Sequence, residues 1–152
     1  MVQLTDEAAE AHARLLVNSY RRWVGQELIH LTPGLSLAEQ IDESPVIVLS
    51  HGTEADPVLY YGNYAALKLW EMDWQQFTST PSRLTAEPME REDRVRFLAQ
   101  VTQYGYVSNY TGIRISSTGR RFYIKQATVW NLVDEAGLYQ GQAATFSQYE
   151  DL

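Results

Sequence analysis

The sequence predicts an α+β fold: a five-stranded antiparallel sheet with helices packed on one face, preceded by an N-terminal helical extension. Two long runs of β-branched and aromatic residues within residues 105–132 flank a Ser-Ser-Thr-Gly turn at 116–119, which indicates a long antiparallel hairpin. Two shorter strand-like runs precede this hairpin, a block of helical patterns lies between, and one more strand-like run follows. A periodic apolar stripe across residues 5–30 indicates a helix ahead of the sheet.

The N-terminal helix is predicted over residues 5–30. Thr5 can cap its N-terminus, and Asp6 and Glu7 suit the first turn, where carboxylates complement the helix dipole. The Thr-Pro-Gly segment at 32–34 is predicted to end the helix. The apolar stripe has two interpretations that stay open: the helix docks on its own domain, or it pairs with a second copy to make a homodimer.

Three short elements are predicted next. Ser36 and Glu39 have the spacing of a capping box, which predicts a short helix over 37–41. Residues 46–50 are rich in β-branched side chains and too few for a typical helix, so we expect a strand buried on both faces at the centre of the sheet. A second strand is expected over 58–61.

A helical block and a last strand complete the order. Asn63 can cap a helix over 64–71, and Pro88 suits the first turn of a longer helix that Gly105 would end. After the hairpin, residues 138–147 are predicted to form the last strand, and the remaining residues a tail.

Composition and charge exclude several classes of function. The formal net charge is −7, so a phosphate backbone would repel the chain on average and nucleic acid is not an expected partner. The chain has no cysteine, which excludes disulfides, thiolate metal sites and thiol nucleophiles. No apolar run approaches the ~18 residues of a membrane span, and the N-terminus lacks the basic and apolar regions of a signal peptide. We therefore expect a soluble cytoplasmic protein with no membrane contact.

The residues indicate neither a metal site nor a catalytic one. His12, His30 and His51 lie 18 and 21 residues apart, which is not a ligand spacing. Ser50 and His51 are neighbours whose side chains would point to opposite faces of a strand, so adjacency alone makes no catalytic dyad. The sequence contains no Gly-x-Ser-x-Gly motif, phosphate-binding loop or dinucleotide fingerprint. We expect no enzymatic activity.

A set of motifs spread over residues 45–147 is distinctive beyond its secondary structure. The motifs are Leu49-Ser50-His51-Gly52, Asp56-Pro57, Tyr61-Gly62-Asn63, Leu67, Trp70-Glu71-Met72, Pro81-Ser82-Arg83, Ala86-Glu87-Pro88, Glu90-Arg91, Arg94, Gly105-Tyr106, Asn109-Tyr110, Gly112, Arg114, Ser116, Gly119-Arg120-Arg121-Phe122, Trp130-Asn131-Leu132 and Gly141-Gln142-Ala143-Ala144. In this order they resemble the PAS superfamily and, more closely, the MEKHLA domain. This PAS-like family occurs at the end of certain plant transcription factors and as short stand-alone bacterial proteins. We accordingly divide the chain into an N-terminal helical extension, 1–44, and a PAS-like domain, 45–152.

The resemblance implies a PAS-type pocket between helices and sheet. Light-oxygen-voltage relatives form a flavin–cysteine adduct, which this chain cannot form, and Ile124 stands where those domains place a flavin-contacting asparagine. The string 130–132 is similar to their Phe-Trp-Asn-Leu strand but falls too late in the chain. Residues 64–104, where a haem ligand is expected, contain no histidine. We therefore expect no cofactor, while a noncovalently bound flavin or another small molecule stays open.

The hairpin supplies the candidate ligand site. A turn centred on residues 118–119 would place Ile115 opposite Phe122 and bring five candidate ligand-binding residues to one side of the sheet. These candidates are Asn109, Thr111, Gln126, Thr128 and Trp130. A buried polar group without a partner costs about 1–3 kcal/mol, so the first four either bond to one another or form the polar end of a small pocket. A three-residue turn would exchange the faces and bring Tyr110 and Arg114 forward instead.

The function expected from the resemblance is a sensory or small-ligand-binding module without a covalent cofactor, which acts through dimerisation or a signalling partner protein. The alternatives are a pure interaction or dimerisation domain with a filled core, and a small enzyme on the same scaffold.

Overall fold

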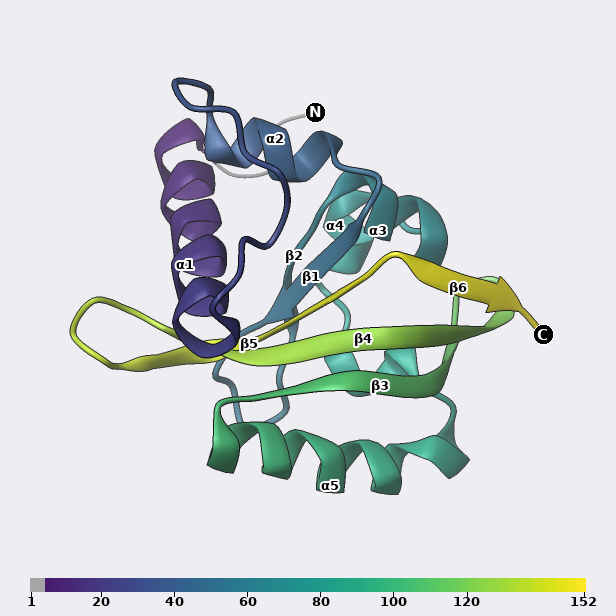
Figure 1. Ribbon diagram of the computed structural model, residues 1–152. Coiled ribbons are helices and arrows are strands. Elements are labelled where there is room, and N and C mark those ends of the chain that lie inside the picture. Colours follow the sequence, from purple (N-terminus) through teal and green to yellow (C-terminus); the bar gives the residue numbers. More distant parts are fainter. Residues whose placement is uncertain (1–4) are drawn as a thin grey trace.

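The computed structural model describes residues 5–152, apart from the side chains of residues 88–90. The strands form one antiparallel sheet in the order β2-β1-β5-β4-β3, and β6 pairs with β4 beyond the end of β5 (Figure 1). The elements are α1 (Asp6–Val24), α2 (Leu37–Glu43), β1 (Ile47–His51), β2 (Leu59–Gly62), α3 (Tyr64–Trp70), α4 (Trp74–Phe77), the 3₁₀ helix η1 (Ser82–Thr85), α5 (Pro88–Tyr104), β3 (Tyr106–Ile115), β4 (Arg121–Val133), β5 (Tyr139–Phe146) and β6 (Gln148–Asp151). The predicted α+β fold class is confirmed.

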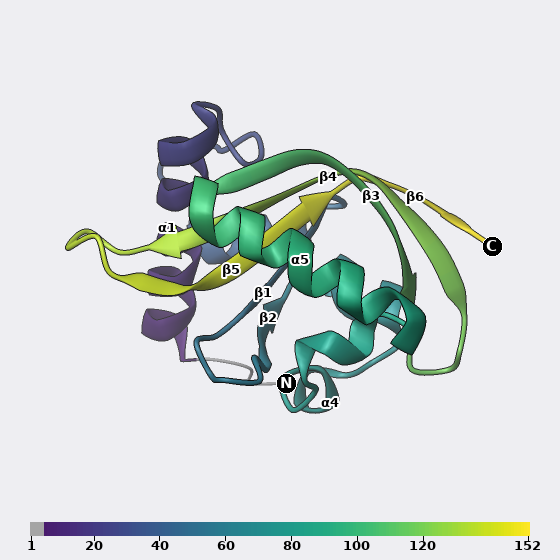
Figure 2. The same cartoon turned by 90° about the horizontal axis from the view of Figure 1, so that it is seen from below.

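Helices cover both faces of the sheet, because the N-terminal helix docks on the face opposite α5. Trp130 and Asn131 are consecutive in β4 and therefore point to opposite faces. Trp130 meets Tyr20 of α1 with ring centroids 4.9 Å apart, while Asn131 donates to the Val101 carbonyl of α5 at 3.0 Å. Figures 1 and 2 show α1 and α5 on either side of the strands.

The first helix is shorter than the sequence predicts. Thr5 caps it as expected and accepts a hydrogen bond from the Ala8 amide at 3.1 Å. The helix ends at Gly25, whose φ of 78° lies in the left-handed region, so the predicted end at 32–34 is wrong. Glycine adopts this conformation without the steric penalty of a Cβ, which is why it ends helices.

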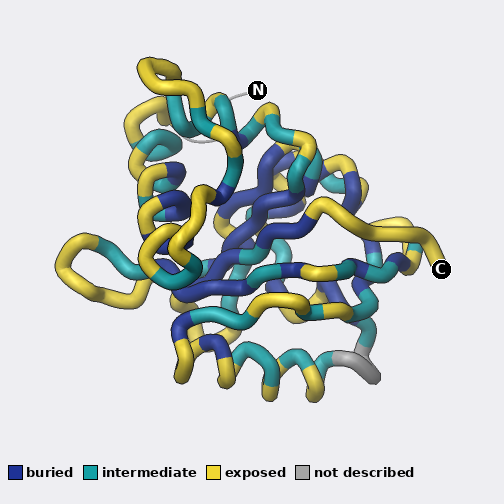
Figure 3. The backbone as a smooth tube through the Cα atoms, viewed as in Figure 1, coloured by how far each residue is buried: buried dark blue, intermediate teal, exposed yellow. Residues whose placement is uncertain are grey.

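One hydrophobic core joins α1 to the rest of the domain. The buried side of α1 consists of Ala13, Leu16, Val17, Ser19 and Tyr20. Figure 3 shows the buried residues of α1 continuous with those of the central strands. The predicted division after residue 44 thus separates two segments that share this core. The stripe proposed as a dimer surface is occupied by the helix's own sheet.

The predicted caps downstream are confirmed, and one receives a partner from α1. Ser36 caps α2 by accepting from the Glu39 amide at 3.2 Å. Glu10 of α1 also accepts from the Leu37 and Ala38 amides, both at 3.0 Å. The hydrogen bond from the Ala38 amide is the main cause that lowers the pKa of Glu10 below its ordinary value. This carboxylate fastens α2 to α1.

The hairpin register differs from the prediction by one residue. Ile115 pairs with Arg121 rather than with Phe122, and the Ser116 amide donates to the Arg120 carbonyl at 2.9 Å. The loop between those two residues is therefore the three-residue alternative, 117–119. This loop exchanges the faces of β3, so that Tyr110 and Arg114, not the odd-numbered residues, point toward α5.

Contacts with α3 explain this choice of loop. The Ser117 amide donates to the Trp70 carbonyl at 3.0 Å, and the Ser117 hydroxyl donates to the Glu71 carbonyl at 2.7 Å. The Glu71 carboxylate accepts from the hydroxyls of Ser116, at 2.6 Å, and Thr118. The C-terminus of α3 thus holds the turn in place, which no pattern within the hairpin reveals.

Two bulges interrupt the hairpin further along. Asn109 and Gln126 have φ values of 60° and 52°, a region that residues with side chains rarely enter, and the β3–β4 register shifts beside each. The break between β5 and β6, at Ser147, falls opposite Gln126 in the register that both strands share with β4. The predicted tail is therefore a sixth strand that continues β5 past the bulge.

Charged residues line the outer side of α5. Glu92 and Arg96 are four residues apart, and their exposed side chains form an ion pair at 3.4 Å. Glu90 and Arg94 have the same favourable spacing in the sequence, but the side chain of Glu90 lies outside the described residues. Across residues 5–152, no helix is both long and apolar enough to cross a membrane.

Candidate functional site

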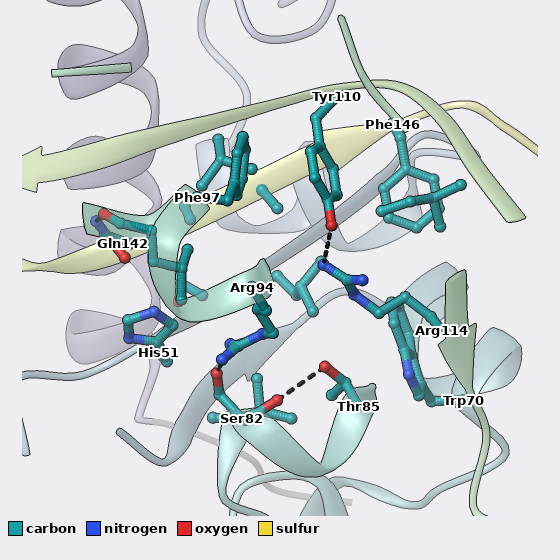
Figure 4. Close-up of a pocket in the computed structure, with 18 residues that line it drawn as sticks. His51, Trp70, Ser82, Thr85, Arg94, Phe97, Tyr110, Arg114, Gln142 and Phe146 are labelled. Atoms are coloured by element: carbon teal, nitrogen blue, oxygen red, sulfur yellow. Dashed lines mark hydrogen bonds between the residues drawn. The ribbon is translucent and has the colours of Figure 1, made fainter. Parts of the chain in front are cut away.

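A small cavity lies between α5, η1 and the inner face of the sheet (Figure 4). Its volume is about 60 Å³. Strands β1, β3, β4 and β5 form its floor, and side chains of α5 and η1 line the opposite side. This is the position in which the resemblance predicts a pocket, although the residues that line it are not those that the predicted hairpin register selected.

Arg114 is the most deeply buried charge in this cavity. It lies in β3 with 9% of its surface exposed, because the pleat of the strand turns it toward α5. It donates to the carbonyl of Ile113 at 2.9 Å and, at 3.4 Å, to the hydroxyl of Tyr110. Its guanidinium carbon also lies 5.4 Å from the centre of the Tyr110 ring, within the range of a cation–π contact.

The Tyr110 ring folds into the cavity because of two neighbours. It stacks on Phe97 of α5 with ring centroids 4.0 Å apart. Gly112 lies two residues further along the same face, and a Cβ there would stand 2.5 Å from the Tyr110 hydroxyl oxygen. Only glycine leaves this space free, so the Tyr110–Gly112–Arg114 sequence places the hydroxyl next to the guanidinium.

Arg94 brings a second guanidinium into the cavity from α5. It donates to the hydroxyl of Ser82 in η1 (Figure 4). Burial, together with repulsion from Arg114, lowers the pKa of Arg94 to about 10. At a pKa of about 10 Arg94 stays charged at neutral pH, and it lies close enough to Arg114 for the two guanidinium groups to repel each other.

Two ring nitrogens of the cavity wall are buried without a partner. The Trp70 indole N–H has none among the described residues, and Trp70 is 1% exposed. The His51 Nδ1 donates to the Gly52 carbonyl at 3.0 Å, which leaves its buried Nε2 as an acceptor, also without a described partner. Burial lowers the pKa of His51 below its ordinary value, which favours the neutral ring.

An amide network connects the cavity to both layers of helices. Gln142 of β5 lines the cavity and donates to the Thr102 hydroxyl at 3.0 Å and to the Asn131 side-chain oxygen at 3.1 Å. Asn131 in turn donates to the last carbonyls of α5, and its own carbonyl accepts from the Trp23 indole of α1 at 3.0 Å. The sheet therefore couples α5 to α1 at Asn131, whose side chain bonds to α5 and whose backbone carbonyl bonds to α1.

The structure does not gather the predicted ligand-binding residues in this cavity. Asn109, Thr111 and Gln126 are exposed, the first and third of them at the bulges. Thr128 and Trp130 point to the α1 face, where Trp130 is fully buried against Tyr20. The three-residue loop turns Thr111 away from α5, while Ile124 of β4 keeps the cavity side. The bulge at Gln126 then turns Thr128 and Trp130 to the α1 face.

The sequence contained part of the correct site. Tyr110 and Arg114 were the alternative that a three-residue loop would bring forward, and the structure adopts that loop. Arg94 was missed because it lies in a run of charged residues that suggests a solvated helix face. The one available signal was that Arg94 follows the acidic first turn by one helical turn, on the side that carries Phe97 and Leu98.

A serine–histidine pair lies on the opposite face of the sheet. The Nε2 of His12 is 2.9 Å from the Ser50 hydroxyl, and burial lowers the pKa of His12 to about 4. Ser50 is only 2% exposed, and its contact with His12 joins α1 to β1.

This cavity is far smaller than a flavin site, and the described residues form no metal-binding cluster. They contain no group of three or more His, Asp or Glu side chains that could hold a metal ion. Cofactor-sized ligands occupy roughly 300–1,000 Å³, whereas this cavity has about 60 Å³. The cavity can hold only a few water molecules or a ligand of a few heavy atoms.

Known structures share this fold. A PAS domain of a protein from Colwellia psychrerythraea matches with a TM-score of 0.63 and 13% identity, over 76% of this chain and 92% of that one. A light-oxygen-voltage domain studied with a flavin analogue matches with a TM-score of 0.61 and 13% identity, over 78% and 86%. At such low identity these likenesses show a PAS-type fold and nothing about ligands.

Sequence comparison assigns the family. The homeobox-leucine zipper protein ATHB-9 of Arabidopsis thaliana is 30% identical over 137 residues, which cover 86% of this chain. The chain spans about 16% of the length of that plant relative. The sequence pattern of the MEKHLA domain matches residues 10–151, which include most of α1 and all of the sheet. The chain therefore belongs to the MEKHLA domain family.

Proposed function

We propose that this PAS-like sensory domain binds a small molecule, noncovalently and without enzymatic turnover, in the cavity between α5, η1 and the sheet. The observation that supports the proposal is the cavity itself, which has two buried guanidinium groups, Arg94 and Arg114, in its wall. A core that served only stability would gain nothing from two like charges, because buried charges are expensive to desolvate. A binding site uses such groups to fix the orientation of a ligand.

The amide network offers a route by which a ligand in the cavity would change the position of α5 and α1. A ligand between Arg94 and the sheet would pull on α5, whose C-terminal carbonyls are held by Asn131 and Gln142. Asn131 also receives the Trp23 hydrogen bond, so a shift of α5 would reach α1. A partner protein that contacts α1 or the 134–138 loop would sense this shift.

Native mass spectrometry of the freshly purified chain tests the proposal. Ala144 of β5 lines the cavity and pairs with Leu49, so its side chain points inward. Ala144→Leu would add three carbons and fill the available volume. We expect a retained small molecule, or stabilisation by a compound library, in the wild type and not in Ala144→Leu. An exposed substitution in α1, Ala11→Leu, is the control and should leave ligand retention unchanged.

The proposal fails if the wild type retains no small molecule and no library compound raises its melting temperature. Ala144→Leu would then only fill a void. The small volume of the cavity, about 60 Å³, favours one alternative, a dimerisation or interaction domain with a filled core. Under that alternative Ala144→Leu leaves partner binding intact, and light scattering would show a dimer.

A homodimer would have to use a surface other than the apolar stripe of α1. The residues that α1 leaves exposed include Glu7, Arg14, Asn18, Arg21 and Arg22, which are polar or charged. Homodimerisation and a signalling partner thus stay proposals, and any dimer contact made by α1 would be polar.

A further inference from the structure

We propose that the ligand of this cavity is a small organic carboxylate, with its anionic group held between Arg94 and Arg114 and its short hydrocarbon tail against the aromatic end. This inference rests on the function proposed above and specifies its chemical class.

Arg114, the more deeply buried of the two guanidinium groups, has no carboxylate partner among the described residues. Among the described side chains, which leave out Glu90, no carboxylate lies within 4.0 Å of Arg114 or Arg94. Arg114 carries the argument because it is nine-tenths buried, yet its contacts are one good hydrogen bond, to a backbone carbonyl, and a long one to Tyr110. A guanidinium has five N–H donors, and a carboxylate accepts two of them in parallel.

Two other polar groups near Arg94 and Arg114 can donate as well, whereas the unpartnered His51 Nε2 elsewhere in the wall is an acceptor. The Trp70 indole N–H is buried in the wall and lacks a described partner. The Ser82 hydroxyl accepts from Arg94 and keeps its own hydrogen available, and Figure 4 places Trp70 directly beside the Arg114 side chain. A neutral ligand would leave most of these donors unmatched.

The remaining wall is apolar, so the part of the ligand beyond its anionic group should be apolar as well. Phe97, Ile124, Val129 and Phe146 line the cavity beyond the guanidinium groups. Inorganic oxyanions would place polar oxygens against these side chains. A carboxylate with a short alkyl tail matches both ends, and about 60 Å³ limits it to roughly two to four carbons.

The test is an NMR titration of the full chain, with melting temperatures measured in parallel. Sodium acetate, propionate and butyrate are compared at constant ionic strength with propionamide, a neutral isostere, and with inorganic phosphate. We expect binding to tighten about fourfold for each added methylene group, as burial of one CH₂ predicts. Propionamide and phosphate should bind more weakly than propionate.

Arg114→Met is the decisive variant, and Arg96→Met, on the exposed side of α5, is its control. Loss of one charge-assisted contact predicts propionate binding at least about tenfold weaker in Arg114→Met and unchanged in Arg96→Met. Without ligand, Arg114→Met should melt at the same temperature as the wild type or higher, because it removes a buried charge. A purely structural arginine would instead lower the melting temperature.

The outcomes separate this inference from the proposed function. Propionamide binding as tightly as propionate, with Arg114→Met equal to the wild type, would overturn the carboxylate and keep the ligand-binding module. Phosphate binding more tightly than propionate would also overturn it, in favour of an inorganic oxyanion. If no compound of any charge binds, both proposals fall together.

Discussion

The indole ring of Trp23 lies against the backbone of Gly105, so closely that a Cβ added to Gly105 would stand 2.5 Å from a ring carbon. This contact joins the end of α1 to the point where α5 turns into β3. Gly105 also has a φ of 96°, which residues with a Cβ rarely adopt. The family motif that begins at Gly105 therefore has a packing role besides its role as a helix cap.

Gly105→Ala should destabilise the domain through both effects. We expect on the order of 2–4 kcal/mol, from left-handed strain and from displacement of the Trp23 ring. Denaturant unfolding followed by tryptophan fluorescence measures the loss. Gly137→Ala is the matched control, since Gly137 has a φ of 83° and nothing within 4 Å of an added Cβ. Equal losses in the two variants would show that Trp23 makes no contribution.

Deletion of residues 1–34 should unfold the domain. The deletion removes Leu16, Val17 and Tyr20, which are at most 8% exposed and cover the outer face of the sheet. Burial of such side chains contributes roughly 1.5–3 kcal/mol each, which approaches the whole stability of a small domain. Circular dichroism and light scattering check this outcome. A folded monomer after deletion would contradict it and would restore α1 as an independent extension.

His12 should make the domain less stable as the pH falls from about 6.5 toward 4. The folded-state pKa is about 4 and the ordinary value is 6.5, so the unfolded chain binds the proton first. The stabilisation is complete above pH 6.5, disappears across this window, and amounts to on the order of 3 kcal/mol. Urea unfolding at a series of pH values measures it.

His12→Gln keeps a donor near Ser50 but does not titrate, so its stability should change less over the same pH range. His30→Gln is the control, because His30 is exposed and should leave the profile unchanged. The buried His51, whose pKa is also lowered, adds a dependence of the same sign that survives in His12→Gln. Identical profiles for wild type and His12→Gln would refute the role of His12.

Asn63 should be among the least replaceable polar residues of the core. Its amide donates to the carbonyls of Ile41 and Val46, and its oxygen accepts from the amides of Val48 and Ala66. One fully buried side chain thus ties α2, β1 and α3 together.

Asn63→Asp keeps the size and the acceptor but places a carboxylate against two carbonyls. We expect a loss of at least about 3 kcal/mol in unfolding free energy, since two buried carbonyls lose their donors. Asn18→Asp, on the exposed side of α1, should change stability by less than about 0.5 kcal/mol. Thermal unfolding of both variants tests this prediction. Similar melting temperatures for Asn63→Asp and Asn18→Asp would contradict it.

Local chemistry explains why much of the fold was predictable. Caps at Thr5, Ser36, Asn63 and Gly105 depend on a few consecutive residues, and each forms as expected. The central strand β1 was predictable because its apolar run is stable only where both faces of the strand are buried. The sequence pattern does not reveal the helix end at Gly25, because apolar residues continue at helical spacing as far as Leu28.

The candidate site depended on contacts that are distant in the sequence. Two-, three- and four-residue loops all suit the Ser-Ser-Thr-Gly turn, and Glu71, 45 residues from Ser116, selects the three-residue one. That choice moved Tyr110 and Arg114 into the cavity and left Asn109 and Gln126 at exposed bulges.

The sequence by itself therefore determined most of the elements, their order, the family and the absence of thiol chemistry. Only the tertiary structure decided which face of β3 meets α5, that α1 completes the sheet, and that Arg94 and Arg114 share a cavity. The physical reason is that the side-chain period of a strand is two, so a single residue of turn length reverses the side chains that follow it, up to the next bulge. Contacts from the C-terminus of α3 join the hydrogen bonds within the loop in fixing this length.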